Sequence, residues 1–178
     1  MFEVATLRCI AIFKIRNMQT QQELFTKIAL DSWNIQIVRT NKLLESLTDE
    51  QLQQEVATNR NSGVYLLGHL TAVHDAILPL LYFGEKLHPE LEETFIKNPD
   101  KSSLSKPETS LLRRYWNEVN SALASHFNKL TPDEWLQKHA AISDEDFAKE
   151  PHRNRLSVLL NRTNHLSYHY GQLAFLKK

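Results

Sequence analysis

The sequence is poor in the residues that build several common kinds of functional site. Its 178 residues include one cysteine, Cys9, which excludes an internal disulfide and any metal site with several cysteine ligands. Only four glycines occur, which argues against a glycine-rich phosphate-binding loop and favours a helical protein. No stretch approaches the roughly 18 consecutive apolar residues of a membrane-spanning helix. The lone cysteine also fits a reducing compartment, so we expect a cytoplasmic protein.

The sequence also lacks net charge, because 21 basic and 21 acidic side chains balance to a formal charge of zero. No stripe of lysine and arginine stands out, so we expect neither nucleic acid nor an anionic membrane as a partner. Hydrophobic residues make up 42% and charged residues 24%, the balance of an ordinary soluble globular protein. The length suffices for one domain with a sizeable core.

The first 17 residues differ from the rest of the chain. They are fairly apolar but carry Arg8, Lys14 and Arg16 within or after the apolar part, the reverse of a secretory signal. Met18 opens "MQTQQELF" and could serve as an alternative start. We therefore expect residues 1–17 to be an N-terminal extension peripheral to the fold, and residues 18–178 to form a single domain.

Four segments carry apolar residues at the spacing of an α-helix. The first helix is predicted over about residues 20–47. The apolar side chains that share one face of it are Leu24, Ile28, Ile35 and Val38. The second begins near Ser62 and runs to Gly84, weakened where Pro79 lacks the N–H that would bond the carbonyl of Asp75. The third begins near Pro107, and the fourth spans about residues 155–176.

The apolar stripes of the last three helices predict the core of a helical bundle. They consist of Leu66, Leu70, Val73, Ile77 and Leu80; of Leu112, Trp116, Val119, Leu123 and Phe127; and of Leu159, Thr163, Leu166, Tyr170 and Leu173. Residues 85–106, between the second and third helices, are polar and contain prolines, which predicts a long connection of the kind that often forms a lid or rim. No strand-rich region follows residue 18, so the expected fold class is all-α.

The two halves of the chain are similar to each other. "LTDEQLQ" after the first helix is similar to "LTPDEWLQ" after the third, and "GHLTAVH" in the second helix to "NHLSYHY" in the fourth. Each half is therefore predicted to contain a helix, a Leu-Thr-acidic turn, a loop and a histidine-bearing helix. This repetition predicts a pseudo-symmetric four-helix bundle.

His165 and His169 lie four residues apart in the last helix, which places their rings one above the other on the same face. Rings so placed can reach a common metal ion. His69, beside the core stripe of the second helix, also points toward the bundle interior. Three histidines from two facing helices can form an open metal site, with water or substrate in the remaining positions. The spacing alone leaves ordinary core packing as the alternative.

The remaining histidines favour other roles. His74 lies about 140° around the helix from His69 and is expected on the surface or at an interface. His126, beside Phe127, is expected in the core or behind the ligands. Three histidines are expected to be solvated in polar loops: His88, His139 and His152.

These residues resemble the DinB/YfiT-like metalloenzyme family, a superfamily of four-helix bundles. "LLGHLTAVHD", with His69, matches the histidine that members carry on the second helix. "NHLSYHYGQL", with His165 and His169, matches their His-x-x-x-His pair on the last helix. The resemblance extends from about Met18 to the end, including helix order and the long connection after the second helix. It implies a tri-histidine site for a divalent ion (zinc, nickel or iron suit three imidazoles alike) and a homodimer.

The resemblance also implies two chemistries on a small-molecule substrate. Some relatives activate a low-molecular-weight thiol for transfer to an electrophile, and others are metal-dependent hydrolases. No Asp or Glu lies within a turn of the three histidines on their helices, so a built-in general base is not evident, which favours thiol transfer. A non-catalytic metal-binding bundle that acts in a stress response is the alternative outside enzymes. Arg162, one turn before His165, is a candidate contact for an anionic substrate group, with a partly buried salt bridge as the alternative.

Overall fold

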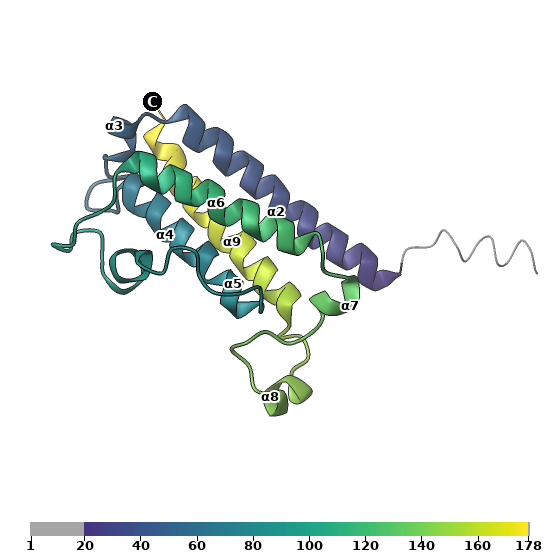
Figure 1. Ribbon diagram of the computed structural model, residues 1–178. Helices are drawn as coiled ribbons and strands as arrows, with labels where there is room; N and C mark the ends of the chain where they lie inside the picture. The colour runs from purple at the N-terminus through teal and green to yellow at the C-terminus, as the bar shows by residue number, and fades with distance from the viewer. Residues whose placement is uncertain (1–19, 178) are drawn as a thin grey trace, which may run out of the picture.

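The computed structural model describes residues 20–177 as helices and the segments that join them (Figure 1). Four long helices form the bundle: α2 (Gln21–Ser46), α4 (Gly63–Asp75), α6 (Thr109–Phe127) and α9 (Arg155–Leu173). The short helices are α3 (Asp49–Leu52), α5 (Ile77–Leu80), η1 (Glu93–Lys97), α7 (Pro132–Trp135), α8 (Asp144–Lys149) and η2 (Ala174–Leu176). The extended pairing within residues 20–177 amounts to two isolated bridges, so the all-α prediction is confirmed.

Two of the sequence predictions stay untested by this structure. The prediction that residues 1–17 form a peripheral extension lies outside the described residues. Within residues 20–177 no helix has both the length and the apolar character needed to cross a membrane. The cytoplasmic location remains a prediction.

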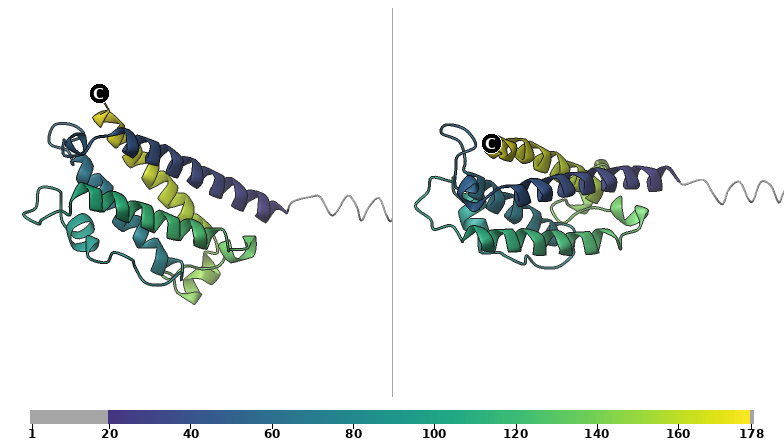
Figure 2. Two further views of the ribbon diagram at one scale, coloured as in Figure 1. Left: turned by 45° about the horizontal axis from the view of Figure 1, so that its top comes forward. Right: turned by 90° about the horizontal axis from the view of Figure 1, so that it is seen from above.

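The direction of the four long helices explains the long connection. α2 and α9 run one way along the bundle, whereas α4 and α6 run the other way (Figures 1 and 2). Because α4 and α6 are parallel, the chain that leaves α5 must return along the whole bundle before α6 begins. Residues 81–108 make this return, and η1 packs against α4 on the way.

The two halves of the chain repeat one local design. α3 and α7 each begin with a threonine, Thr48 or Thr131, whose side chain and backbone bond reciprocally with the residue three positions later. An isolated antiparallel bridge then precedes each histidine-bearing helix, Glu55 with Ser62 and Lys138 with Asn154. Ser62 and Asn154 are also the N-cap residues of α4 and α9. The predicted repetition of the sequence is thus a repetition of structure.

The core contains most of the predicted stripes. All five predicted residues of α6 and four of the five on α9 are buried. The predicted second helix is divided: α4 ends at Asp75, and α5 follows Ala76, because Pro79 has no N–H to continue the ladder to the Asp75 carbonyl. Val73 and Leu80 are only partly buried.

α2 has the predicted bounds, but its regular apolar face points outward. Thr20 caps the helix through a complete capping box, and Leu47 follows its last turn. The exposed fractions of the apolar residues on the predicted face are Leu24 47%, Ile28 56%, Ile35 55% and Val38 51%. The side chains of α2 that are buried instead are Thr26, Ala29, Trp33, Thr40, Leu43 and Leu44. The periodicity identified a helix correctly without identifying which of its faces meets the core.

Candidate metal centre

Three histidine rings from two helices converge at one point. The Nε2 atom of His165 lies 3.2 Å from Nε2 of His69 and 3.1 Å from Nε2 of His169. One ligand atom from each residue can be chosen such that all three lie within 4.8 Å of one another. His69 comes from α4 and the other two from α9, as the sequence predicted. His169 is buried, and the other two are partly exposed.

The spacing of these nitrogen atoms fits a divalent ion. Imidazole nitrogens bind zinc at about 2.0–2.1 Å, so two ligands of a tetrahedral ion lie about 3.3 Å apart. The two measured separations are close to this value. Three protein ligands also leave a position free for water or substrate, which is the arrangement of catalytic rather than structural zinc sites.

The hydrogen bonds at the far side of two rings leave Nε2 free to bind a cation. Nδ1 of His69 lies 2.8 Å from the carbonyl oxygen of Phe95, and Nδ1 of His169 lies 2.7 Å from Oε1 of Gln172. Because a carbonyl oxygen only accepts, each Nδ1 must carry the proton and donate it. A neutral ring with a proton on Nδ1 has its lone pair on Nε2. Such bonds orient metal-binding histidines and raise their basicity.

The carbonyl that orients His69 is placed by a glycine. Phe95, in η1, packs so tightly on Gly68 that a Cβ at that position would lie 2.3 Å from the phenyl ring. Any larger residue at position 68 would displace the ring and the carbonyl attached to the same residue. The close approach of η1 to α4 therefore fixes the direction of the His69 ring.

The surroundings favour neutral histidines. Burial, together with the closeness of two further imidazoles, His169 and His69, and of the Arg162 guanidinium, lowers the pKa of His165 to about 4. Burial also lowers the pKa of His169, although the bond to Gln172 acts in the opposite direction. Both rings are thus neutral near pH 7, the form that binds metals. Nδ1 of His165 is buried and has no partner among residues 20–177.

The predicted location of His74 is wrong. Its ring is completely buried between Trp33 and Trp116, with centroid separations of 4.8 and 5.0 Å, and Nδ1 bonds Oδ1 of Asn120 at 2.8 Å. The face of α4 that carries His74 is also buried, because Trp33 of α2 and Trp116 of α6 pack against it. His74 therefore packs in the core and does not join the three converging rings.

His88 and His126 both stack on aromatic rings away from the three converging histidines. His88 was expected in solvent, but it stacks on Tyr115 at 3.6 Å and bonds Glu118 at 3.1 Å. His126 is half-buried and stacks on Phe83. Neither ring lies in the group that could hold a metal.

Arg162 is half-buried on α9, one turn before His165. The salt bridge considered for it is not found: among residues 20–177 its guanidinium has no carboxylate oxygen within 4.0 Å. Its one hydrogen bond joins Nη1 to Oδ1 of Asn161 at 3.3 Å, and Nε is buried without a partner in the described part of the chain.

The sequence reasoning missed the groups that orient the ligands. Gln172 lies three residues after His169, a spacing that brings side chains together on a helix, so it could have been proposed from the sequence. The Phe95 carbonyl could not, because it is a backbone atom 26 residues from its partner in sequence.

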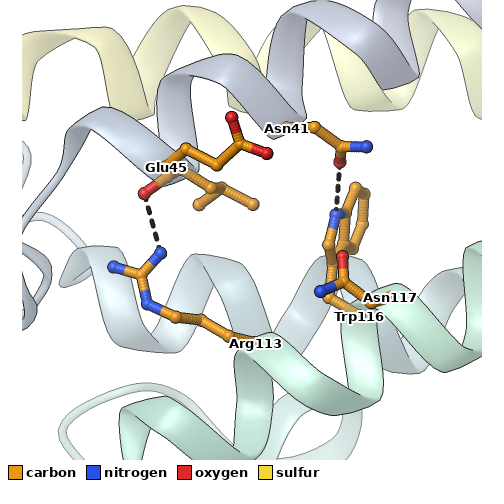
Figure 3. A pocket seen from close by; sticks show the side chains of 6 residues that line it. Asn41, Glu45, Arg113, Trp116 and Asn117 are labelled. Carbon is orange, nitrogen blue, oxygen red and sulfur yellow. Dashed lines mark hydrogen bonds between the residues drawn. The ribbon is translucent and has the colours of Figure 1, made fainter.

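A separate pocket between α2 and α6 is poorly suited to bind a metal ion or a polar substrate. Two of its polar groups already bond across it, as Figure 3 shows: Arg113 donates to the carbonyl of Leu44 at 2.7 Å, and Trp116 to Oδ1 of Asn41 at 2.8 Å. Arg113 also bonds the Leu47 carbonyl and Asp49. It therefore caps the C-terminus of α2.

Comparison with known proteins agrees with this geometry. The family model of the DinB superfamily matches residues 33–173, which contain all three converging histidines. A crystal structure of a conserved protein from Enterococcus faecalis is similar in fold, with a TM-score of 0.59 and 16% sequence identity. The similarity covers 85% of this chain and 94% of the other. Among curated proteins, none matches the sequence significantly.

Proposed function

The chain belongs to the DinB superfamily, and on that premise we propose that it is a metal-dependent enzyme whose divalent ion is held by His69, His165 and His169. The observation that carries the proposal is the convergence of three Nε2 atoms, two of which belong to rings whose Nδ1–H donates elsewhere. Nε2 of His165 can donate a proton to only one of the other two Nε2 atoms at a time, whereas a single cation would accept the lone pairs of all three.

We propose thiol transfer as the reaction: the sulfur of a low-molecular-weight thiol forms a bond to the electrophilic carbon of a small molecule, the bond from that carbon to its leaving group breaks, and the thiol proton passes to water. A bound divalent ion would lower the pKa of a thiol or of water at the open position. Hydrolysis usually also requires a group that accepts a proton from the attacking water. No Asp or Glu of residues 20–177 joins the three histidines in the cluster, which favours a thiol, since a thiol needs less help to ionise.

Elemental analysis of protein purified without a histidine tag tests the metal site first. We expect about one zinc, nickel or iron ion per chain, and no bound ion if the proposal is wrong. The loaded protein is then incubated with 2-mercaptoethanol and 1-chloro-2,4-dinitrobenzene, or with p-nitrophenyl acetate. Metal-dependent consumption of the first pair supports thiol transfer. Consumption of the ester alone supports the alternative, a metal-dependent hydrolase.

A non-catalytic role predicts a different result from the same protein. If removal of the metal lowers the melting temperature but neither substrate is consumed, the ion serves only the fold and the bundle is a metal-binding, stress-related protein. The favoured function requires that the loss of the metal abolish turnover.

We also propose that the active form is a homodimer, formed through the outward face of α2. Leu24, Ile28, Asp31, Ile35 and Val38 follow one another at spacings of four and three, the spacing of a seam between two packed helices. Four of the five are apolar and about half exposed. Monomeric proteins rarely expose such a continuous apolar stripe.

The charges on this face favour an antiparallel pair of α2 helices. Asp31 lies in the first half of α2, and Arg39 in the second half. If the two-fold axis passes near Ile35, Asp31 of one copy faces Arg39 of the other, whereas a parallel pair would set Asp31 against Asp31. An antiparallel second copy would therefore complement this face in charge, in competition with the ion pair that Asp31 forms with Lys27 of its own helix.

Sedimentation of the Ile35→Glu variant tests the dimer. We expect the wild type to sediment as a dimer at micromolar concentration and the variant as a monomer, because two glutamates would meet at the axis. Leu104→Glu, at an exposed apolar position outside the bundle helices, should stay dimeric. A monomeric wild type would refute the proposal.

A further inference from the structure

Beside the three histidines lies a cleft of about 220 Å³. It adjoins the candidate metal centre at three places in the sequence. Val73 lies one turn after His69 on α4, Arg162 lies one turn before His165 on α9, and Ile96 follows Phe95 in η1. With a rise of 1.5 Å per residue, Val73 lies about 6 Å along α4 from His69, and Arg162 lies about 4.5 Å along α9 from His165.

The repeated halves of the chain explain why this side of the site is open. In the alignment of "GHLTAVH" with "NHLSYHY", His69 corresponds to His165, and Val73 corresponds to His169. α9 therefore supplies two ligands, whereas α4 supplies one and has a valine in the equivalent second position. That valine lines the cleft.

The charged side chains that line the cleft differ in whether they have ion-pair or hydrogen-bond partners. Lys86 and Glu92 form an ion pair. The buried Asp75 accepts backbone N–H bonds from Leu87 and His88, each at 2.8 Å. Arg162 is less well satisfied. Within residues 20–177 no carboxylate lies within salt-bridge distance of it, and its Nε is buried without a hydrogen-bond partner. Its single hydrogen bond joins Nη1 to Oδ1 of Asn161.

The contrast with Arg113 shows that this chain satisfies a structural arginine fully. Arg113 donates from Nε, Nη1 and Nη2 to Asp49 and to two carbonyls of α2. Arg162 is similarly half-buried, and burial lowers its pKa, yet a guanidinium stays charged at neutral pH. A half-buried charge with unused donors is costly unless an anion meets it.

We propose that this cleft binds a carboxylate of the substrate, held by Arg162 while the reacting atom of the same molecule occupies the open position of the ion. The inference rests on the proposed metal site and names its substrate class: a small thiol or electrophile that carries a carboxylate close to the reacting atom. A carboxylate suits the two parallel donors of a guanidinium. Asp75 in the same cleft limits the positive charge, which disfavours a phosphate with its higher charge.

Two matched thiols test the inference on the cobalt-loaded protein. 3-Mercaptopropionate and 2-mercaptoethanol both offer a thiol, and only the first carries a carboxylate. Binding is followed by the change in the visible spectrum of cobalt, which does not depend on turnover. Because the carboxylate adds a charge-assisted hydrogen bond to a guanidinium, we expect 3-mercaptopropionate to bind at least tenfold more tightly.

Variants identify the residue responsible. Arg162→Gln should remove the preference, so that the cobalt-loaded variant binds 3-mercaptopropionate and 2-mercaptoethanol with equal affinity. Arg114→Gln, at an exposed arginine of α6, should keep the preference. Equal affinities in the wild type, or a preference that survives Arg162→Gln, would overturn the inference while the metal site stands.

A metal-free measurement separates this inference from the proposed function. In ¹⁵N-labelled protein without metal, propionate should shift the Nε–H resonance of Arg162 and leave that of Arg113 in place. If the protein binds no cobalt, the proposed function fails, and this titration still decides whether the cleft takes a carboxylate. An Arg162 resonance that does not move at saturating propionate would refute the subsite.

Discussion

The helices α4 and α9 occupy equivalent places in the two halves of the molecule and yet carry different chemistry. Each follows a threonine-capped short helix and an isolated bridge, and each begins at a polar N-cap. One turn after the first histidine, however, α4 has Val73 and α9 has His169. At the next position α4 has His74, buried between two tryptophans, and α9 has Tyr170. The two halves thus share a nearly symmetric fold, but α9 contributes two of the three converging histidines and α4 contributes one.

The largest expected effect is on metal affinity and concerns His169, whose equivalent on α4 is Val73. His169→Ala should weaken metal binding by more than about 100-fold, since even the loss of an outer partner of a ligand costs 10–100-fold. Competition with a chromophoric chelator measures the affinity. His74→Ala is the matched control and should bind metal as the wild type does. Equal affinities for His169→Ala and wild type would refute the site.

The second effect concerns the histidine that packs rather than binds. His74→Ala removes a ring held between Trp33 and Trp116 and leaves a cavity, so the free energy of unfolding should fall by about 2–4 kcal/mol. Urea denaturation of metal-free protein measures it. His169→Ala, closer to solvent, should lose clearly less in the same assay. The reverse order would mean that the roles of the two histidines are exchanged.

The third effect is a dependence of stability on pH. Burial, opposed only by the bond to Asn120, lowers the pKa of His74 from 6.5 to about 3. The unfolded chain therefore takes up a proton first, and stability that is complete above pH 6.5 falls as the pH drops toward 3. The contribution is about 1.4 kcal/mol for each pH unit.

Urea denaturation of metal-free protein between pH 7 and pH 5 measures this slope. His74→Phe removes the titrating group and keeps an aromatic ring, so its stability should fall less steeply with acid, by about one proton. Identical slopes in the two proteins would show that His74 does not titrate on unfolding.

The fourth effect would make the two halves alike. Val73→His places a histidine on α4 where α9 has His169, and a fourth imidazole would close the open position. We expect metal to bind about tenfold more tightly, equivalent to about 1.4 kcal/mol, and the cobalt spectrum to lose its response to 2-mercaptoethanol. A variant that still binds the thiol would show that the open position lies elsewhere.

The smallest effect tests the repeated design itself. Thr48→Ala and Thr131→Ala each remove a capping box, and each should lower the free energy of unfolding by about 1 kcal/mol. Thermal and urea denaturation of both variants measure the two losses. Values that differ by several-fold would show that only one half depends on its cap.

Features that depend on residues within one segment of the chain could be predicted from the sequence, whereas features that depend on packing between helices could not. The four long helices, the break caused by Pro79 and the pairing of His165 with His169 follow from spacing within one segment, and all were predicted. The direction in which a helix faces depends on its neighbours. α2 has two candidate faces, and the one that meets the core holds Trp33 together with the polar Thr26 and Thr40, so the more regular apolar face was not the buried one.

The same distinction applies within the candidate site. His69 could be assigned because it lies beside the apolar stripe of its helix and matches the second-helix histidine of the family, although its distance from α9 is a property of the fold. The burial of His74 required two tryptophans from other helices, and the unsatisfied Nε of Arg162 required knowledge of everything around it. Such facts become visible only when the helices are packed.

The parallel course of α4 and α6 has a consequence for how such a protein can diversify. A segment needed merely to carry the chain back to the other end also supplies Phe95, Ile96 and Lys86 to the rim of the site. Replacing or lengthening its remaining residues would reshape the entrance without moving the helices that bear the imidazoles. One scaffold can in this way keep its three converging histidines in place while the chain around them changes.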